Sequence, residues 1–165
     1  MSHRHTPRLL TFDYLGSYRY SLTMCTYRRR PYFNASVNVE RALLQISRSA
    51  EGQGFAVLAY CFMPDHLHML VAGGTEASNA QRFIDLAKQL SGYAHRRATG
   101  ERLWQRSSWD RILRSQDDTA TVIRYLLLNP VRAGLVERPL DHPGSGSLVF
   151  DRQALLDVFQ DRPEG

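Results

Sequence analysis

Residues 55–72 read FAVLAYCFMPDHLHMLVA, and this stretch decides the fold. It holds two apolar runs, 55–63 and 66–72, separated by Pro64 and Asp65, a pair of residues typical of tight turns. Each run has the length of a buried strand and is far shorter than the roughly 20 apolar residues of a membrane helix. We therefore expect a β-hairpin here.

The flanking segments extend this hairpin into a recognisable pattern. Residues 18–27 alternate and are rich in β-forming residues, which predicts a strand, and residues 109–115 predict a short one. Residues 38–54 and 77–98 carry apolar side chains at helical spacing. The order strand, helix, strand, strand, helix, strand is the split βαβ pattern of ferredoxin-like folds. We predict an α+β fold, with an antiparallel sheet and these two helices on one face.

A further helix is expected after the fourth strand. Asp117 or Asp118 can cap its start, and it should end near Asn129, because Pro130 disfavours helical geometry in the residue before it. Residues 152–161 predict a short terminal helix. We divide the chain into an N-terminal arm (1–17), one catalytic domain (18–136) and a C-terminal tail with a short helix (137–165).

Composition and charge favour a folded protein with a polyanionic partner. The chain has 165 residues, 43% of them hydrophobic, and a formal net charge of +5. All basic residues except Lys88 are arginines, whose planar guanidinium donates two parallel hydrogen bonds to a phosphate. The arginines and tryptophans that could pair with phosphates and stack on bases are Arg28, Arg29, Arg30, Arg96, Arg97, Arg102, Trp104, Arg106, Trp109, Arg111 and Arg114. The alternative for the arginines is an ordinary solvated surface, and for the two tryptophans it is a place in the core.

Targeting and redox signals are absent from the sequence. The N-terminus lacks the continuous apolar stretch of a secretory signal, so the cytoplasm is the expected location, with no membrane partner. Cys25 and Cys61 form no CxxC pattern and predict neither a disulfide framework nor a cysteine zinc site. His95 and His142 have no assigned role and are expected at the surface.

His66 and His68 are the first candidates for chemistry. Side chains alternate across a strand, so the two imidazoles point to one face, about 7 Å apart along it, and both can reach one divalent ion. The alternative is two half-exposed strand residues with hydrogen-bonded rings. His3 and His5 have the same spacing in a polar terminus, so spacing alone is weak evidence.

A metal site also needs a third ligand, and the late helix offers one. Tyr125 and Asn129 are four residues apart, and therefore lie on one helical face. Taken alone, a tyrosine in this context is more often a core residue, and an asparagine before proline more often marks a helix end.

Three stretches together resemble a known family. MPDHLHMLV (63–71) resembles the histidine–hydrophobe–histidine strand of HUH-type endonucleases. RYLLLNPVRAGLV (124–136) is similar to the nucleophile helix of single-tyrosine transposases, particularly the REP-associated tyrosine transposases. LWQRSSWDRILRS (103–115) resembles the segment that lies between those two motifs in that group. The stretch HPGSGSLVF (142–150) departs from the family by lacking a tryptophan.

The resemblance implies a function and a role for each matching residue. His66 and His68 match the metal-binding pair, Tyr125 the nucleophile, and Asn129 the third, amide-bearing ligand. It implies Mg²⁺ or Mn²⁺ as cofactor, single-stranded DNA beside a palindromic hairpin as substrate, and a 5′-phosphotyrosine intermediate. Association with the bacterial nucleoid would follow.

Other functions stay open on the sequence. A dimeric insertion-sequence transposase would place Tyr125 of one chain at the histidines of the other, whereas a REP-associated type can be a monomer. A non-catalytic DNA-binding relative would keep only the basic surface. A ferredoxin-like RNA-binding domain would have incidental histidines.

Overall fold

The computed structural model describes residues 18–113 and 119–160. The strands are β1 (Arg19–Thr26), β2 (Phe55–Met63), β3 (His66–Gly73), β4 (Trp104–Leu113) and β5 (Ser145–Gly146). The helices are α1 (Ser36–Gln53), α2 (Ala80–Thr99), α3 (Thr119–Leu127), α4 (Asn129–Arg132) and α5 (Arg152–Gln160). Short 3-10 turns occur at Tyr27–Arg29, Tyr32–Asn34 and Pro139–Asp141.

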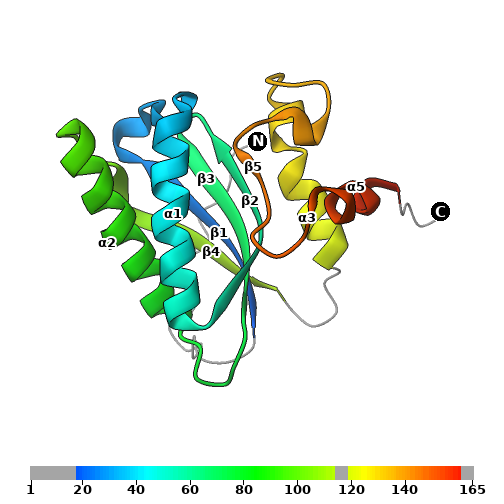
Figure 1. Ribbon diagram of the computed structural model, residues 1–165, viewed down its shortest axis with the longest axis horizontal. Coiled ribbons are helices and arrows are strands. Elements are labelled where there is room, and N and C mark those ends of the chain that lie inside the picture. The colour runs from blue at the N-terminus through cyan, green and yellow to red at the C-terminus, as the bar shows by residue number, and fades with distance from the viewer. Residues whose placement is uncertain (1–17, 114–118, 161–165) are drawn as a thin grey trace.

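The strands form one antiparallel sheet in the order β4-β1-β3-β2-β5 (Figure 1). Strands β1 to β4 and helices α1 and α2 follow one another along the chain in the predicted order. The predicted α+β class with an antiparallel sheet is confirmed. The hairpin of residues 55–72 forms β2 and β3, and β3 is the central strand of the five.

Local signals in the sequence explain where the two long helices begin and end. The side-chain oxygen of Asn79 accepts a hydrogen bond from the backbone N–H of Arg82 and caps the start of α2. Helix α1 ends at Gly54, whose φ of +71° is a left-handed conformation that glycine adopts without a steric penalty.

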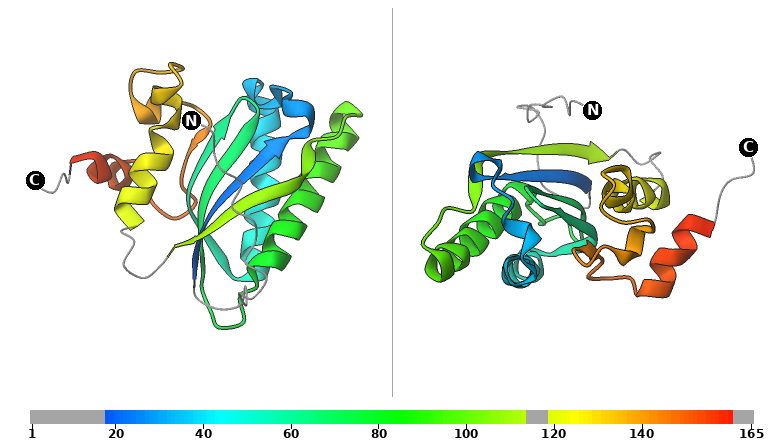
Figure 2. Two further views of the ribbon diagram at one scale, coloured as in Figure 1. Left: turned by 180° about the vertical axis from the view of Figure 1, so that it is seen from behind. Right: turned by 90° about the horizontal axis from the view of Figure 1, so that it is seen from above.

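One face of the sheet is covered by α1 and α2 and forms the main hydrophobic core (Figure 2). Because strand side chains alternate, every second residue faces these helices, among them Leu22, Met24, Leu67 and Met69. Phe83 of α2 is fully buried among them. Among the helices in the described part of the chain, none combines the length and apolarity that a bilayer crossing needs.

The opposite face carries a second, smaller apolar cluster under α3 and α5. It joins Cys61 and Leu70 of the sheet to Ile123 and Leu127 of α3 and Leu155 of α5. Because His66 and His68 are four and two residues before Leu70 on β3, they belong to this second face.

The segment after α4 runs back along the sheet. Phe62 of β2 donates its backbone N–H to the carbonyl of Gly144, and the His142 Nε2 atom lies 2.6 Å from the Phe62 carbonyl oxygen. A side chain at Gly144 would come within 2.9 Å of that same oxygen, so this close approach requires glycine. The region predicted as a tail thus adds β5 and α5 to the fold.

Four sequence expectations need correction. Strand β4 begins at Trp104, five residues earlier than expected, and its start lies in the core. Helix α3 ends at Leu127, so Asn129 begins the next short helix, with Pro130 in the first turn where its missing N–H costs nothing. The surface location expected for His95 is wrong, because α2 buries it; His142 is half-buried.

Candidate active site

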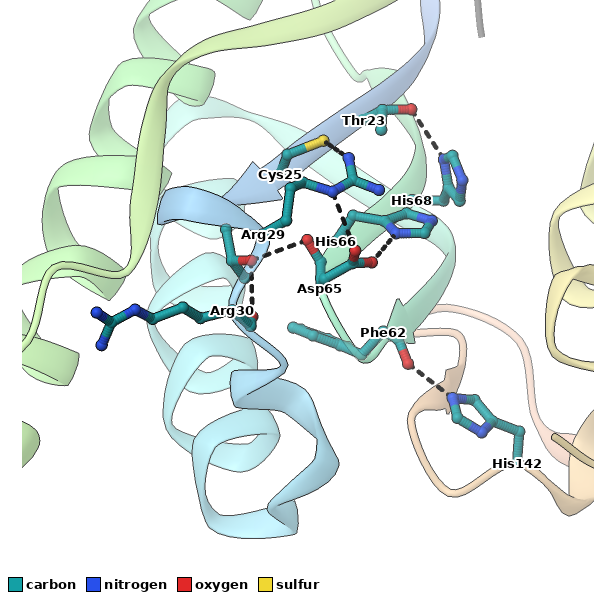
Figure 3. Close-up of polar contacts among 10 residues, drawn as sticks. Thr23, Cys25, Arg29, Arg30, Phe62, Asp65, His66, His68 and His142 are labelled. Atoms are coloured by element: carbon teal, nitrogen blue, oxygen red, sulfur yellow. Dashed lines mark hydrogen bonds and ion pairs between the residues drawn. The ribbon is translucent and has the colours of Figure 1, made fainter. Parts of the chain in front are cut away.

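The two histidines of β3 lie side by side on the α3 face of the sheet (Figure 3). Their ring centroids are 4.7 Å apart and the ring planes are nearly perpendicular, at 85°. His68 is 8% exposed, and the His66 side chain is somewhat more accessible, at 17%. The alternation of the strand predicts this shared face, and the structure has it.

Each imidazole is oriented through its Nδ1 atom. The Nδ1 of His66 lies 2.7 Å from Oδ1 of Asp65, and the Nδ1 of His68 lies 2.8 Å from Oγ1 of Thr23 on β1. A carboxylate only accepts hydrogen bonds, so the Nδ1–H of His66 donates, and that tautomer has its electron pair on Nε2. Metal-binding histidines are typically held in this way, with the second ring nitrogen on a carboxylate or similar partner. The pair therefore fits a divalent metal ion.

Asp65 is in turn held by Arg29. The guanidinium of Arg29 donates through Nε to Oδ2 of Asp65 (3.0 Å) and through Nη1 to Sγ of Cys25 (2.7 Å). Burial raises the pKa of Asp65, but the hydrogen bond with His66 and the charge of Arg29 outweigh it, so the pKa lies below its ordinary value. The carboxylate therefore stays ionised and can orient His66.

The backbone that delivers Arg29 is unusual. Arg28 and Arg29 have φ values of +56° and +54°, a left-handed conformation that is uncommon for residues other than glycine. Thr26 holds the turn in place: its N–H donates to the Asp65 carbonyl, and its hydroxyl donates to the Arg30 carbonyl. Strained backbone of this kind persists where the surrounding contacts fix it, and it often accompanies functional sites.

Sequence reasoning missed these two roles. Asp65 was expected to serve only the turn, although its position directly before His66 was a usable signal. Arg29 was expected only to contact DNA. Its link to the histidines follows from the register that pairs Cys25 with His66 across β1 and β3, which sequence spacing alone does not reveal.

The described residues supply no further ligand of the usual metal-binding types. Among the described side chains, those of residues 18–107, 113 and 119–160, no group of three or more His, Cys, Asp and Glu is arranged to hold a metal ion. A third ligand from these ranges would have to be of another type, such as an amide.

Tyr125 lies on α3 and is 53% exposed. It is two residues from Ile123 and two from Leu127, both buried, so it occupies the opposite side of the helix. The guanidinium of Arg132 lies 4.1 Å from the centre of the Tyr125 ring and donates to the Tyr125 carbonyl (2.7 Å) and to Oδ1 of Asn129 (2.8 Å). We call Tyr125, Asn129 and Arg132 the tyrosine cluster; Arg132 is a member that sequence reasoning missed, although it lies within the quoted motif.

The tyrosine cluster and the histidine pair lie on the same side of the sheet. Cys61 is the cross-strand neighbour of His68 and packs in the apolar cluster beneath α3. Burial raises the pKa of Cys61 to about 11, so the thiol stays neutral beneath α3. Among described residues, no hydrogen bond or ring contact joins Tyr125 or Asn129 to the histidines.

The family model described as "Transposase IS200 like" matches residues 15–125, about two thirds of the chain. The chain belongs to the IS200-like transposase family. The match contains the histidine strand and ends at Tyr125.

Individual relatives of this IS200-like transposase agree with the family. It is 27% identical over 145 residues to a candidate REP-associated tyrosine transposase of Haemophilus influenzae, covering 80% of this chain and 78% of the relative. It is 26% identical over 111 residues to the REP-associated tyrosine transposase of Escherichia coli K12, covering 65% and 61%. The resemblance to REP-associated tyrosine transposases expected from the motifs is confirmed.

A solved structure shares the fold. It is described as the REP-associated tyrosine transposase bound to a REP hairpin, and it matches with a TM-score of 0.69 at 20% identity, over 83% of this chain and 81% of that one. Because only 20% of the residues are identical, this match establishes a shared fold and nothing more.

The predicted DNA-binding residues fall into three groups. The exposed arginines are Arg28, Arg29, Arg30, Arg96, Arg97, Arg102 and Arg106. Trp104 is 4% exposed and donates its indole N–H to Oγ of Ser91, so it occupies the core, as the alternative had it, and its ring cannot stack on a base. Arg114 and the side chains of Trp109 and Arg111 lie outside the described part of the structure.

Proposed function

We propose that this IS200-like transposase cleaves and rejoins single-stranded DNA beside a palindromic hairpin, with Tyr125 as nucleophile. The observation that carries the proposal is the histidine pair oriented through both Nδ1 atoms, in a member of a transposase family. The solved relative described as bound to a REP hairpin supports the choice of DNA. The proposal also places the protein in the cytoplasm, in association with the nucleoid.

His66 and His68, with Asn129 as third ligand, would hold Mg²⁺ or Mn²⁺. Such an ion polarises the scissile phosphate and stabilises the charge that develops on its oxygens. Two neutral imidazoles and an amide leave the positive charge of an ion uncompensated. Asp65 and Thr23 fix the rings, so little reorganisation is needed for binding.

Tyr125 supplies the covalent step. Its phenolic oxygen forms a bond to the phosphorus while the bond from phosphorus to the 3′ oxygen breaks, and the phenol's proton is lost as the leaving oxygen gains one. The products are a 5′-phosphotyrosine and a free 3′-hydroxyl. Attack by a 3′-hydroxyl on the phosphotyrosine reverses the chemistry, restores Tyr125 and joins the strand. The phosphodiester bond is exchanged and its energy is retained.

Arg132 is the positioning residue of this step. Its guanidinium contacts the Tyr125 ring and the Asn129 amide oxygen at once, so nucleophile and third ligand are held together. Tyr125 occupies the side of α3 that faces away from its own sheet. The whole tyrosine cluster therefore has to come close to a histidine pair before the reaction can occur. It does so either by a movement of α3 within one chain or by serving a second copy.

Mixing two inactive variants distinguishes these arrangements. A chain with His66→Ala keeps its tyrosine cluster, and a chain with Tyr125→Phe keeps its histidine pair. If mixing restores cleavage, the active site combines the tyrosine cluster of one chain with the histidine pair of another, in a dimer. Continued inactivity, with wild-type activity proportional to enzyme concentration, assigns it to movement of α3 within a monomer.

The main test looks for the covalent adduct. A labelled DNA hairpin with a single-stranded flank is incubated with protein and Mn²⁺, and protein-linked label is measured on a denaturing gel. We expect an adduct with the wild type and with the control Tyr18→Phe, and none with Tyr125→Phe. An adduct that persists in Tyr125→Phe contradicts the nucleophile, and DNA binding without any adduct in the wild type supports the non-catalytic alternative.

A further inference from the structure

A hollow of about 480 Å³ lies between α2 and the beginning of β4, at the outer edge of the sheet. Its walls carry Lys88, Tyr93 and Arg96 from α2, with Arg102 and Arg106 opposite them. Trp104 lies between these walls and packs its indole against Gly92, where a side chain would come within 3.7 Å. We call this hollow the α2–β4 groove.

The groove concentrates positive charge with no acid to balance it. Its lining contains four basic side chains and no Asp or Glu. Within the described ranges, neither Arg96 nor Arg106 forms an ion pair, and Glu101, beside the groove, is paired with Arg30 at 2.9 Å. A concave surface lined by one sign of charge raises the local potential and selects a polyanion.

The basic side chains are spread along the groove. Lys88 and Arg96 are eight residues apart on α2, about 12 Å at the rise of an α-helix. The Lys88 amine is anchored on the carbonyl oxygens of Gln105 and Arg106, at 2.8 and 3.0 Å, and so ties α2 to β4. Charges distributed over such a length match a chain of phosphates better than a single anion.

Tyr93 adds an aromatic surface to this charge. Its side chain is 63% exposed, and the guanidinium of Arg97 lies 6.0 Å from its ring centre. An exposed ring beside basic side chains is the arrangement by which proteins hold single-stranded nucleic acid, with bases stacked and phosphates paired. The bases of a duplex are already stacked on one another, so an exposed ring favours a single strand.

Backbone hydrogen bonds connect the groove to the end of the sheet that carries the histidines. The N–H of Tyr27 donates to the carbonyl of Leu103 at 2.8 Å, and Thr26, one residue earlier, donates to the carbonyl of Asp65 at 3.0 Å. Arg102 lies over the Tyr27 ring at 4.8 Å. A strand of DNA that leaves the groove across the exposed turn of Arg28 and Arg29 and passes round this end of the sheet reaches Asp65, directly before His66.

We propose that the α2–β4 groove binds a single-stranded segment of DNA next to the scissile phosphate, with Tyr93 stacking on a base and Arg96 and Arg106 pairing with phosphates. This inference rests on the proposed function and adds to it a binding residue, Tyr93, and a path for the strand. It assigns to Tyr93 the stacking that Trp104, buried in the core, does not perform.

The test measures binding without metal, so that it does not depend on cleavage. The probe is a fluorescent oligo-dT of about 20 nucleotides, longer than the roughly 4–16 nucleotides of a typical single-strand site. A duplex of equal length serves as the second probe. Affinity is followed by anisotropy over a range of salt concentrations, and thermal unfolding verifies that each variant folds.

For the arginines we compare two doubly substituted proteins with equal loss of charge. Arg96→Ala with Arg106→Ala should reduce the slope of log K against log salt by about 1.4, which is about 0.7 for each lost phosphate contact. Arg48→Ala with Arg82→Ala removes two exposed arginines outside the groove and should leave the slope unchanged. Equal losses in both proteins would overturn the proposal.

For Tyr93 the comparison is between losing the ring and losing only the hydroxyl. Tyr93→Ala should weaken oligo-dT binding by roughly 5- to 150-fold, the range for one stacked base, and Tyr93→Phe should bind as the wild type. Unchanged binding in Tyr93→Ala contradicts the stacking role. A loss of duplex binding that parallels the loss of oligo-dT binding contradicts the single-strand assignment. Absence of a covalent adduct in the wild type would refute the proposed cleavage while leaving these binding results intact.

Discussion

The two faces of the central strands differ in composition and in purpose. Towards α1 and α2 the sheet presents large rings in close contact, such as Phe33 against Phe62 at 4.9 Å and Phe55 against Phe83 at 5.0 Å. Towards α3 the apolar residues are smaller, and the same strand places His66 there. One face carries the packing and the other carries the polar groups.

The difference shows how one short strand can contribute to the hydrophobic core on one face and to the candidate active site on the other. Leu67 and Met69 of β3 are buried in the main core, while His66 and His68, one residue away on either side of Leu67, face α3. Packing on one face fixes the strand, and the strand then fixes the imidazoles. Substitutions on the two faces should therefore separate stability from function.

The largest expected effect is on the packed face. Phe83→Ala removes a fully buried ring and should lower the free energy of unfolding by about 3–5 kcal/mol. Tyr125→Ala, which removes an exposed ring from the other face, should change it by less than about 1 kcal/mol. Urea denaturation followed by circular dichroism measures both, and equal losses would contradict the separation of the two faces.

Next in size is the support of the histidine pair. Asp65→Ala removes the acceptor that orients His66 and should weaken Mn²⁺ binding about 10- to 100-fold, the usual range for such partners. Asp141→Ala is the control, because it removes an equally charged acid paired with Arg138 away from the histidines. Calorimetric titration with Mn²⁺ in the absence of DNA gives both affinities; unchanged affinity in Asp65→Ala would refute this role.

The sequence was sufficient where a pattern is local. The Pro64–Asp65 turn and the alternation of β3 are encoded by neighbouring residues, and the motifs around His66 and Tyr125 identify the family. Contacts that depend on how neighbouring strands align could not be predicted from the sequence.

Register-dependent contacts include those of Arg29 with Asp65 and of Thr23 with His68, which join residues 36 and 45 positions apart. The start of β4 was also missed, because the stretch before residue 109 does not read as a strand until Leu103 and Trp104 are seen to fill the core. Burial of His95 likewise follows from how α2 packs.

A smaller effect is expected at Trp104. Trp104→Phe keeps most of the packing but removes the hydrogen bond to Ser91, and should cost about 1 kcal/mol of stability. Because the ring is buried, oligo-dT binding should not change. Measuring denaturation and anisotropy on the same sample tests both statements, and a stable protein with impaired DNA binding would reinstate Trp104 as a stacking residue.

The smallest expected effect is a pH dependence of the free energy of unfolding, which arises from His95 on the packed face. His95 is buried edge-on against the Tyr32 ring, and burial, followed by the charge of Arg41, lowers its pKa, with Glu101 opposing them. Below the ordinary histidine pKa of about 6.5 the unfolded chain takes up the proton first, so the free energy of unfolding falls as the pH decreases. Above that pH both states are neutral and the dependence vanishes.

His95→Phe should therefore flatten the stability profile between about pH 7 and pH 5. Urea denaturation at several pH values, for the wild type and this variant, measures the difference. Profiles that stay parallel would show that His95 titrates equally in both states.

The central claim is that the histidine pair on the α3 face binds the metal ion, and Mn²⁺ titration of three proteins tests it most directly. The wild type and the variant with His3→Ala and His5→Ala, a pair of the same spacing, should each bind Mn²⁺ at the β3 site. The variant with His66→Ala and His68→Ala should fold and lose that binding. Undiminished binding in this last protein, or a loss that instead follows His3 and His5, would contradict the account.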